Sequence, residues 1–518
     1  MTAARLDPVA LQVIVGALRA TCEEMGAVLI RSAHSANIKE RRDASTALFD
    51  PAGEMVMQAE HIPVHLGAMP AAVAAVRDAD HAPGRAWVLN DPYAGGTHLP
   101  DITVVTPVFE RDDPADPGAL LGFAANRAHH ADVGGPTPGS MPADSRTLAD
   151  EGVVIPPQPL DEAAIERLVA QMRQPAQRRA DLRAQLAANR AGARRLAELA
   201  QRTGVATLRA AMAEVLDYAE RRTRACIAAL PDGVRTARDV LEGADGDVEL
   251  ALTATVDGDR LVLDFAGTAA QHDGNLNCPL AVTRSACYFA VRVLTDPDIP
   301  ASAGAYRPIE VRAPAGCLLN AQPPHAVVAG NVETSSRVAD LVLAAFGRAL
   351  GQGTMNNLTL GNDRFTYYET IGGGQGASDD ADGPSAVHVA MSNTLNTPIE
   401  ALELEFPLRV VEYGLRRGSG GAGARRGGDG VVRELEALAP MEFSLITERR
   451  RHGPPGAAGG APGAVGRNLL DGRALGPKAR GRLAPGSRLR IETPGGGGHG
   501  RPRHPANHPE KSGDLQGN

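Results

Sequence analysis

The residue composition changes along the chain, and these changes constrain the fold more than any single motif does. Between residues 160 and 230, Ala, Leu, Arg and Glu dominate, and leucines recur at helical spacing. From about residue 355 onward, short apolar runs alternate with glycine-rich stretches such as 372–376 and 493–498. A chain of 518 residues is expected to form about three or four domains. We therefore expect a multidomain α+β protein with mixed sheets, a helical insert and a glycine-rich, β-rich C-terminal region.

Turn and breaker residues divide the chain further. Pro175 and Gly204 split the helical stretch, which we interpret as a helical hairpin or a three-helix insert. An Asp257-Gly258 pair between alternating apolar runs is typical of a β-hairpin turn. These signals predict five segments: an N-terminal α/β region with a candidate metal site at 1–158, a helical hairpin insert at 159–233, an α/β middle region at 234–354, a β-rich C-terminal region at 355–500 and a disordered tail at 501–518.

Local periodicity predicts several individual elements. Apolar residues at helical spacing indicate an amphipathic helix over 9–39, and further helical runs lie near 281–294 and 334–350. Short apolar runs at 102–108 and 119–125 are typical of buried strands. The N-terminal region is therefore expected to combine helices with a sheet.

Charge and lysine content exclude several classes of function. The formal net charge is −8 and the isoelectric point is near 6.0, so no overall positive field favours nucleic acid. Among the 53 basic residues only Lys39, Lys478 and Lys511 are lysines, and the Gly-Lys-Ser/Thr step of a Walker phosphate loop does not occur. We therefore expect neither a Walker-type ATPase nor a cofactor carried on lysine.

Cysteine usage and hydropathy indicate the compartment. The five cysteines are widely spread and contain no CxxC pair, so neither a disulfide framework nor a cysteine zinc site is expected. The N-terminal residues lack the pattern of a signal peptide, and no apolar stretch is long enough for a transmembrane helix. We expect a cytoplasmic protein without a membrane partner.

Metal-capable side chains concentrate in three segments of the first part of the chain. Two histidines and two or more carboxylates from separated loops suit a divalent ion of intermediate hardness, such as Mn, Fe or Zn. The adjacent histidines would point to opposite faces of a strand, so one can bind a metal while the other faces substrate. The alternative is that these are ordinary polar loop or core residues. The segments supply Asp43 from ERRD, His98 and Asp101 from THLPD, and His129, His130 and Asp132 from AHHAD.

Two further patterns have competing interpretations. His61 and His65 are four residues apart, but Pro63 between them disfavours the helix of a zincin motif, so we interpret both first as structural or pocket-wall residues. The glycine runs are either nests of backbone N–H groups that approach an anion or tight turns between strands. We favour tight turns.

An ordered series of motifs covers nearly the whole chain. Read in order, these motifs resemble the hydantoinase B/oxoprolinase family, the B subunits of ATP-dependent hydantoinases. That family is related to the C-terminal half of 5-oxoprolinase and to a large subunit of acetone and acetophenone carboxylases. The motifs include ERRDASTALFD (40–50), HIPVHLGAMP (61–70), NDPYAGGTHLPDITVVTPVF (90–109), NRAHHADVGGPTPGSMP (126–142), GNVETSSRVAD (330–340) and GQGTMNNLTLG (351–361).

The resemblance implies a division of labour between two subunits. An A subunit of the actin-like ATPase type, which handles ATP and Mg, phosphorylates the amide or ketone oxygen of the substrate. The B subunit then acts on the activated intermediate at one divalent metal ion, Mn, Zn or Fe. The absence of a phosphate-loop lysine agrees with this division. The implied ligands are Asp43, His98, Asp101 and His129, with His129 preferred to His130 on the family's loop pattern.

The resemblance also implies a function and a set of roles. We expect the B subunit of an ATP-dependent cyclic amide hydrolase, in which metal-activated water opens a phosphorylated hydantoin or lactam ring. An A2B2-type hetero-oligomer is expected. The alternatives are a subunit of an acetone- or acetophenone-type carboxylase and a non-catalytic assembly subunit. The candidate roles are general base for His130 or Asp132, and binding of substrate or its phosphoryl group for Arg127, Arg337, Arg42 and His61.

Overall fold

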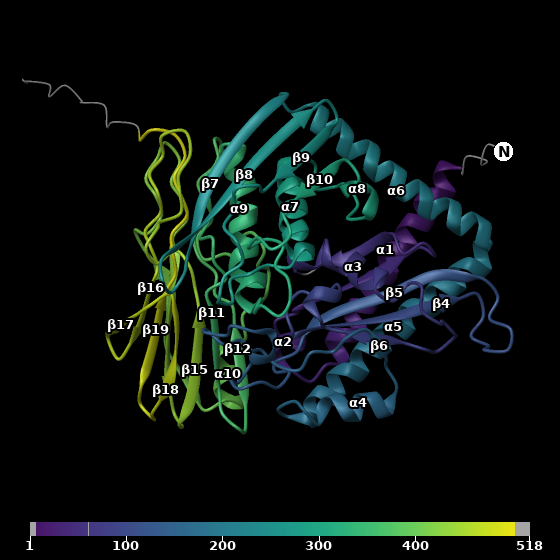
Figure 1. Ribbon diagram of the computed structural model, residues 1–518, viewed down its shortest axis with the longest axis horizontal. Helices are drawn as coiled ribbons and strands as arrows, with labels where there is room; N and C mark the ends of the chain where they lie inside the picture. Colours follow the sequence, from purple (N-terminus) through teal and green to yellow (C-terminus); the bar gives the residue numbers. More distant parts are fainter. Residues whose placement is uncertain (1–6, 61, 503–518) are drawn as a thin grey trace, which may run out of the picture.

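The computed structural model describes residues 7–60 and 62–502. Its N-terminal part is built on a six-stranded antiparallel sheet with the order β2-β1-β5-β4-β3-β6 (Figure 1). The long strands β4 and β5 are buried because helices pack on both faces of the sheet. The strands are β1 (Ala44–Phe49), β2 (Met55–Glu60), β3 (Trp87–Leu89), β4 (Asp101–Phe109), β5 (Leu120–His129) and β6 (Gln158–Pro159).

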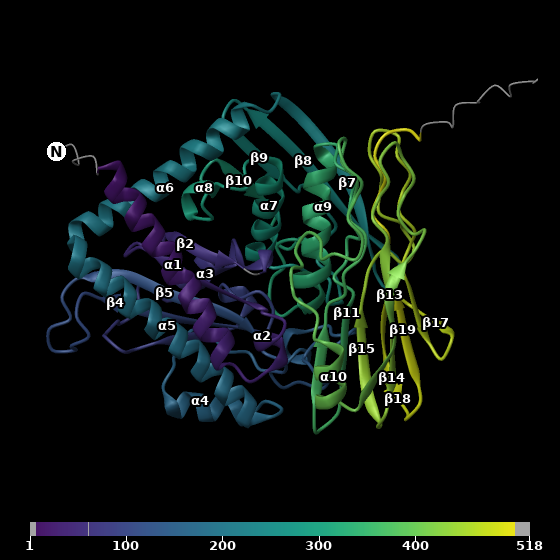
Figure 2. The same cartoon turned by 180° about the vertical axis from the view of Figure 1, so that it is seen from behind.

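The first helix, α1 (Pro8–Ser32), lies beside the long helix α5 on one face of this sheet (Figures 1 and 2). Asp7 caps α1, because its side chain accepts a hydrogen bond from Ala10 N at 3.2 Å. The prediction of one helix over 9–39 is wrong: the backbone becomes extended at Ala33, and a separate short helix, α2 (Ala36–Lys39), follows. The apolar face of α1 is formed by Ile14, Leu18, Cys22, Met25 and Leu29.

Three helices form the predicted insert. Asp161 caps α4, its carboxylate accepting a hydrogen bond from Ala164 N at 2.7 Å. Pro175 begins α5, and Gly204, with a φ of 85°, separates α5 from α6. The stretch therefore holds three helices rather than two. Its helices are α4 (Glu162–Val169), α5 (Pro175–Thr203) and α6 (Val205–Ala228).

A second sheet, of order β10-β9-β8-β7, forms the middle of the molecule. The predicted hairpin turn at Asp257-Gly258 is confirmed, since it joins β8 to β9. The helices α7 and α9 pack against each other, and α9 contacts β7 and β8. The elements are β7 (Gly233–Glu242), β8 (Asp247–Asp257), β9 (Arg260–Asp264), α7 (Leu280–Leu294), α8 (Ala303–Tyr306), β10 (Ile309–Arg312), the π-helical turn η4 (Gly330–Thr334) and α9 (Ser335–Ala345).

The C-terminal region consists mainly of two antiparallel sheets, of order β12-β11-β15-β18 and β13-β14-β19-β16-β17. The two sheets share one apolar core, which includes Leu358, Leu435 and Leu489. The elements are β11 (Asn357–Gly361), β12 (Thr366–Glu369), α10 (Ile399–Glu405), β13 (Leu408–Arg416), β14 (Gly430–Ala437), β15 (Met441–Ile446), β16 (Arg467–Leu470), β17 (Arg473–Leu475), β18 (Lys478–Leu483) and β19 (Arg488–Glu492).

Glycine runs pack backbone against backbone beside these sheets. A Cβ on Gly374 would lie 2.0 Å from the carbonyl oxygen of Gly428, and one on Gly496 would lie 2.0 Å from that of Gln375. Hydrogen bonds join the same backbones: Gly428 N donates to Gln375 O and Gly496 N donates to Gly428 O, both at 2.9 Å. We call the runs 372–376, 420–428 and 495–498 the glycine layer. Its segments approach so closely that only glycine fits at these contacts.

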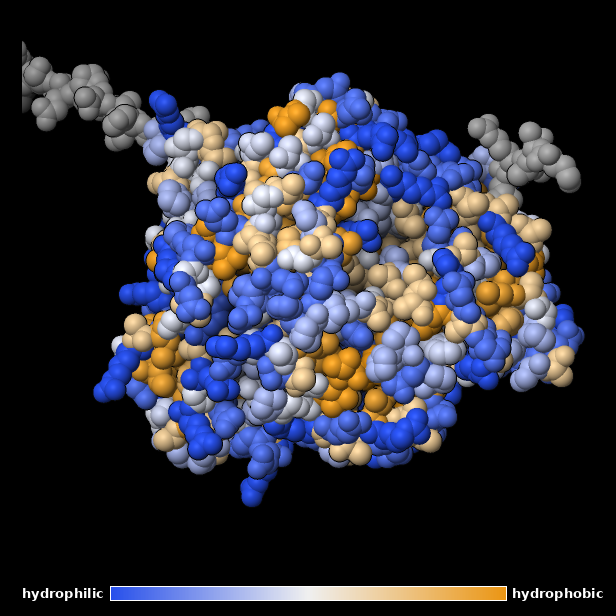
Figure 3. Space-filling model, viewed as in Figure 1, coloured by the Kyte–Doolittle hydropathy of each residue, from blue (hydrophilic) through white to orange (hydrophobic). Residues whose placement is uncertain are grey.

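The expected α+β class is confirmed, whereas the division into five segments stays a prediction. The expected tail at 501–518 lies outside the described residues from 503 onward. On the face seen in Figure 3, polar and charged side chains predominate and the apolar ones form separate patches. Among the helices that the structure describes, none combines the length and the apolar character needed to span a membrane.

Candidate metal centre

The pairing of β4 with β5 brings predicted metal ligands together at one end of the N-terminal sheet. Asp101 is the first residue of β4 and His129 the last of β5, and the register places them opposite each other. His98 precedes β4 in a tight turn closed by a hydrogen bond from Asp101 N to His98 O at 3.0 Å. All three side chains are buried, and we call them the His/Asp cluster.

The ligand atoms of the His/Asp cluster are in contact with one another. Asp101 Oδ1 lies 3.2 Å from His98 Nε2 and 3.1 Å from His129 Nδ1, and the two nitrogens are 3.1 Å apart. Ligands that share one ion, at bonds of about 2.0–2.2 Å, are separated by distances of this size. Burial lowers the pKa of His129 to about 4, so its imidazole is neutral near pH 7, as metal binding requires. The donor set fits a divalent ion of intermediate hardness.

Neighbouring side chains fix the carboxylate of Asp101. Thr97 Oγ1 donates to Asp101 Oδ2 at 2.6 Å, and His65 Nε2 lies 3.6 Å from the same oxygen. His65 is held in turn by Ser45, whose Oγ lies 2.8 Å from His65 Nδ1. Burial opposes ionisation of Asp101, but the electrostatic effect of His98 and hydrogen bonds from the surrounding histidines hold the pKa of Asp101 well below its usual range. Asp101 therefore presents Oδ1 to the cluster as a carboxylate of fixed orientation.

Asp43, the fourth predicted ligand, lines the same small cavity as the cluster. Its backbone carbonyl accepts a hydrogen bond from His129 N at 3.0 Å, which ties the ERRD segment to the end of β5. Burial and the negative charge of Asp101 raise the pKa of Asp43 to about 6. The cavity measures about 20 Å³, enough for one water-sized group or ion.

The opposite wall of this cavity comes from residues that sequence reasoning missed. Tyr368 stacks on His129, with ring centroids 4.6 Å apart and 15° between the planes. The Tyr368 hydroxyl donates to Asn357 Oδ1 at 2.6 Å, and the Arg41 guanidinium lies 5.1 Å from the Tyr368 ring centroid. Asn331, on η4, is buried, and its Oδ1 has no hydrogen-bond partner among the described residues. Arg41 lies in the ERRD segment, and Asn331 and Asn357 lie within two of the quoted motifs, but no local spacing marks them, or Tyr368, as neighbours of the cluster.

The structure does not bring His130 or Asp132 into the cavity. His130 follows the end of β5 and faces α5, with its Nε2 3.0 Å from Gln185 Oε1. Asp132 organises the next loop, because its carboxylate accepts hydrogen bonds from Gly134 N and Gly139 N, both at 2.7 Å. Each side chain is thus engaged away from the cluster, and the geometry gives no support to the general-base role predicted for them.

Arg127 is the predicted arginine that lies on the same face of the sheet as the cluster. It is two residues before His129 on β5, and its Nε donates to Thr103 Oγ1 at 2.7 Å. Its Nη2 donates to Gly95 O at 2.9 Å, whereas Nη1 has no hydrogen-bond partner in the described part of the chain. Burial lowers the pKa of Arg127 to about 10, so the guanidinium stays charged near pH 7.

The other predicted binding residues are placed differently. Arg337 is buried in an ion network far along the chain, pairing with Asp239 at 3.2 Å and with Glu448 at 3.3 Å. Arg42 is exposed at the surface. His61 lies outside the described residues. The structure therefore does not bring Arg337 and Arg42 to the cluster.

Comparison with known proteins identifies relatives over almost the whole chain. The family model described as hydantoinase B/oxoprolinase matches residues 7–502. The chain is 41% identical to 5-oxoprolinase 1 of Arabidopsis thaliana, over 95% of this chain and 42% of that protein. It is 32% identical to a Pseudomonas sp. protein named as the B-type subunit of a D-/L-hydantoinase, over 96% of this chain and 90% of the relative. The chain thus spans about two fifths of the 5-oxoprolinase relative and most of the hydantoinase relative.

Solved structures show the same fold. An ATP-dependent caprolactamase from Pseudomonas jessenii superposes with a TM-score of 0.88 at 29% identity, covering 96% of this chain and 92% of that chain. Acetone carboxylase in its nucleotide-free form superposes with a TM-score of 0.84 at 17% identity, covering 95% of this chain and 76% of that chain. At that lower identity the likeness to acetone carboxylase concerns the fold alone.

Proposed function

This chain belongs to the hydantoinase B/oxoprolinase family, and we propose that it is the B subunit of an ATP-dependent cyclic amide hydrolase. The observation that carries the proposal is the His/Asp cluster, in which three buried ligand atoms lie 3.1–3.2 Å from one another. Such crowding of lone pairs is unfavourable unless a cation or protons lie between them. The substrate would be a hydantoin or a lactam.

The residues around the cavity suit a metal-assisted hydrolysis. A divalent ion (Mn, Zn or Fe) held by His98, Asp101 and His129, with Asp43 as the fourth donor, would act as a Lewis acid and lower the pKa of water at the site. Thr97 fixes Asp101 from behind and thereby orients its Oδ1 toward the cavity.

Three further side chains would position the substrate and the ligands. Tyr368 packs flat against His129 and is anchored by its hydrogen bond to Asn357, so it limits rotation of the imidazole. Asn331 has a buried carboxamide oxygen, Oδ1, with no hydrogen-bond partner in the described part of the chain. This oxygen can accept a hydrogen bond from the N–H of a ring amide. Arg127 offers its charged Nη1 on the same face of the sheet.

The ATP-dependent step would belong to a partner. The sequence lacks the Gly-Lys-Ser/Thr step of a Walker phosphate loop. The relative named as a hydantoinase subunit points to a second polypeptide, and the 5-oxoprolinase relative extends well beyond the part that this chain matches. We therefore assign ATP and Mg to an A-type ATPase subunit in an A2B2-type assembly.

A reconstitution experiment tests this function. The chain is co-purified with an A-type ATPase partner, its metal content is measured, and hydantoin, 5-oxoproline and a simple lactam are assayed with ATP, with and without bicarbonate. We expect ring opening that needs both subunits and ATP but not bicarbonate. Consumption of a ketone that requires bicarbonate would instead identify a carboxylase subunit.

A matched pair of variants connects the function to the cluster. His98→Ala should abolish bound metal and ring opening, while ATP hydrolysis by the partner persists, because the variant removes one donor. His34→Ala, at an exposed histidine outside the cavity, should behave as the wild type. Full ring opening by metal-free His98→Ala protein would reject the proposal and favour a non-catalytic assembly subunit.

A further inference from the structure

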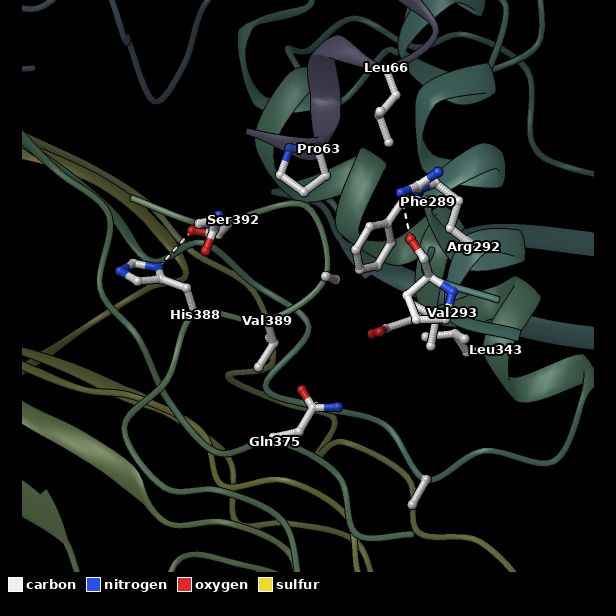
Figure 4. Close-up of a pocket in the computed structure, with 16 residues that line it drawn as sticks. Pro63, Leu66, Phe289, Arg292, Val293, Leu343, Gln375, His388, Val389 and Ser392 are labelled. Carbon is white, nitrogen blue, oxygen red and sulfur yellow. Dashed lines mark hydrogen bonds between the residues drawn. The ribbon is translucent and has the colours of Figure 1, made fainter. Parts of the chain in front are cut away.

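A second, larger cavity adjoins the small cavity of the His/Asp cluster, and one serine lines both. The larger cavity measures about 560 Å³, within the usual range for sites that hold small molecules. Its lining is mixed, since Phe289 and Val293 are apolar whereas Arg292 and His388 are polar (Figure 4). We call this cavity the chamber. Ser392 lines the chamber and also the cluster cavity, so it belongs to the wall between them.

Ser392 differs from the other hydroxyl residues of the cluster cavity in its hydrogen-bond partner. Tyr368 donates to an asparagine amide, and Thr370 and Thr394 hydrogen-bond to each other at 2.5 Å. Ser392 Oγ instead lies 2.7 Å from His388 Nδ1 (Figure 4). Among the described hydroxyl groups around the cluster cavity, that of Ser392 is therefore the one paired with an imidazole, the side chain best suited to proton transfer near pH 7.

The surroundings of His388 favour its neutral form. Burial, together with the nearby Arg41 guanidinium, lowers the pKa of His388 to about 4. A neutral imidazole with its proton on Nε2 presents Nδ1 as an acceptor, so it can take the hydroxyl proton of Ser392. Once protonated, the same imidazole is a strong proton donor, because its surroundings disfavour the positive charge.

The backbone around His388 is held in an unusual conformation. Ala386 and Ala390 have φ angles of 56° and 50°, in the left-handed region that residues with a Cβ seldom adopt. Such strained positions cluster at functional sites, where the surrounding structure enforces them. Here the glycine layer contributes, since Val387 and Gly373 exchange two backbone hydrogen bonds of 2.9 Å. The segment that carries His388 is thus fixed by its neighbours.

The proposed reaction needs a route for protons between two places. Water adds to the carbon–nitrogen double bond of the O-phosphorylated ring, so its oxygen ends on carbon and both of its protons must end on nitrogen before the C–N bond breaks. The tetrahedral adduct can expel either group. If phosphate leaves first, the intact ring is regenerated and ATP is wasted. If the protonated nitrogen leaves, the ring opens to an acyl phosphate, which a second water hydrolyses. Delivery of protons to nitrogen therefore decides the outcome.

We propose that Ser392 and His388 form a proton shuttle that carries protons from the attacking water in the cluster cavity to the ring nitrogen in the chamber. The Ser392 hydroxyl accepts a proton from the water and passes its own to His388 Nδ1. The transfers then run back through Ser392 to the ring nitrogen, which keeps the electron pair of the broken C–N bond. The inference rests on the proposed function, and it fills the general-base role for which the geometry does not support His130 or Asp132.

Two substrates with different leaving groups test the shuttle. The complex with the A-type partner is assayed on 2-pyrrolidinone, which expels an alkylamine, and on hydantoin, whose expelled nitrogen is stabilised by a second carbonyl. Ser392→Ala and His388→Gln should each lower kcat for 2-pyrrolidinone at least about a hundredfold, and kcat for hydantoin less than about tenfold. Structural damage would lower both alike. His452→Gln is the matched control, because this exposed imidazole lies 2.7 Å from Asp247 Oδ2, outside both cavities.

The coupling of ATP use to ring opening gives a second readout on any ring that is opened. The wild type should release phosphate and opened ring in equal amounts. In Ser392→Ala and His388→Gln the ratio of phosphate to opened ring should rise at least about tenfold, because the adduct then expels phosphate.

NMR of the isolated chain tests the pair without turnover. With ¹⁵N-labelled histidine, the His388 ring, assigned by its loss in His388→Gln, should stay neutral between about pH 5 and pH 8, and Ser392→Ala should shift its Nδ1 signal. A His388 ring that gains its charge in this range, or that Ser392→Ala leaves unchanged, overturns the shuttle.

The outcomes also separate the inference from the proposed function. If the wild type opens rings but both variants keep its rates, or lose rate equally on the two substrates at an unchanged phosphate ratio, the shuttle is overturned and the proposed function stands. If the wild-type complex opens no ring, the proposed function fails and the shuttle fails with it.

Discussion

Two buried groups of titratable side chains differ in how their charges are compensated. In the ion network around Arg337, each guanidinium faces carboxylates of the same chain: Arg337 pairs with Asp239 and Glu448, and Arg449 pairs with Asp239 at 2.7 Å and Asp340 at 3.2 Å. In the His/Asp cluster, by contrast, atoms that carry lone pairs face one another.

The comparison shows which group is complete within the chain. A buried charge is tolerated when a partner of opposite charge and hydrogen bonds compensate its desolvation. The ion network meets this condition with its own residues, which indicates a structural role. The cluster meets it with a cation or with shared protons between its ligand atoms, so its geometry suits a binding site. Sequence alone does not show that Arg337 is compensated, because its partners Asp239 and Glu448 come from distant parts of the chain.

The largest expected effect comes from breaking the cluster at one of two adjacent histidines. His129→Ala removes a donor and should abolish stoichiometric metal binding and lower kcat/KM for ring opening by at least about a thousandfold. His130→Gln changes a side chain that faces Gln185, and should keep the metal and most of the activity. Metal content and steady-state kinetics are measured for both variants. Loss of metal in His130→Gln but not in His129→Ala would show that His130 is the ligand.

The second largest expected effect is on the free energy of unfolding, when the ion network loses one arginine. Arg337→Met leaves buried carboxylates without one of their partners and should lower the free energy of unfolding by about 3–5 kcal/mol. Arg85→Met, at an exposed pair with Asp80, should change it by less than about 0.5 kcal/mol. Urea denaturation measures both. An Arg337→Met protein of normal stability that has lost substrate binding would break the comparison and restore the predicted phosphoryl-binding role.

A buried carboxyl without a cationic partner gives a third, smaller effect. Glu151 accepts backbone hydrogen bonds from Val327 and Val328, and burial raises its pKa from the ordinary value of 4.5 to about 7. The folded state therefore binds the proton more tightly than the unfolded state, so this group lowers stability as the pH rises from about 4.5 to about 7. Glu151→Gln should remove about 2–3 kcal/mol of that pH dependence in urea titrations at pH 5 and pH 8. Identical pH dependence in both proteins would contradict the assignment.

The smallest expected effect is on metal affinity, and it tests whether Tyr368 supports the His/Asp cluster. Tyr368→Leu removes the ring that stacks on His129 and should weaken metal affinity about tenfold, because groups that orient a ligand contribute to binding. Tyr368→Phe keeps the stack, loses the hydrogen bond to Asn357, and should show a smaller loss. Competition with a chelator measures the affinities. Equal loss in both variants would assign the effect to the hydroxyl rather than to the stack.

The cluster could be predicted from sequence because its ligands come from neighbouring strands. His98 and Asp101 are three residues apart, and Asp101 lies opposite His129 in the register of β4 with β5. Strand alternation also predicted that His129 and His130 face opposite ways. The far wall could not be predicted: Tyr368 and Asn331 come from distant segments, and no local period marks residues that meet only through tertiary packing.

The predicted roles of Arg337 and Asp132 depend in the same way on tertiary contacts. Arg337 is a reasonable candidate for a phosphoryl group until its partners, Asp239 and Glu448, are found beside it from other parts of the chain. Asp132 is a candidate base until its carboxylate is found to cap the glycines of its own loop. The helix boundaries predicted at Pro175 and Gly204 are confirmed. Such boundaries can be predicted because they depend on the conformational preferences of nearby residues.

The glycine layer has a consequence for the order in which the protein matures on the ribosome. The three residues of the His/Asp cluster all lie within the first 129 residues, so their side chains emerge early in synthesis. The backbone that holds Gln375 also packs against Gly496, and Gly497 N donates to Leu350 O at 2.8 Å, so this scaffold waits for residues 495–498. The segment that carries the cluster is therefore synthesised long before the backbone contacts of the glycine layer can close, and a chain that ends before residue 495 lacks those contacts.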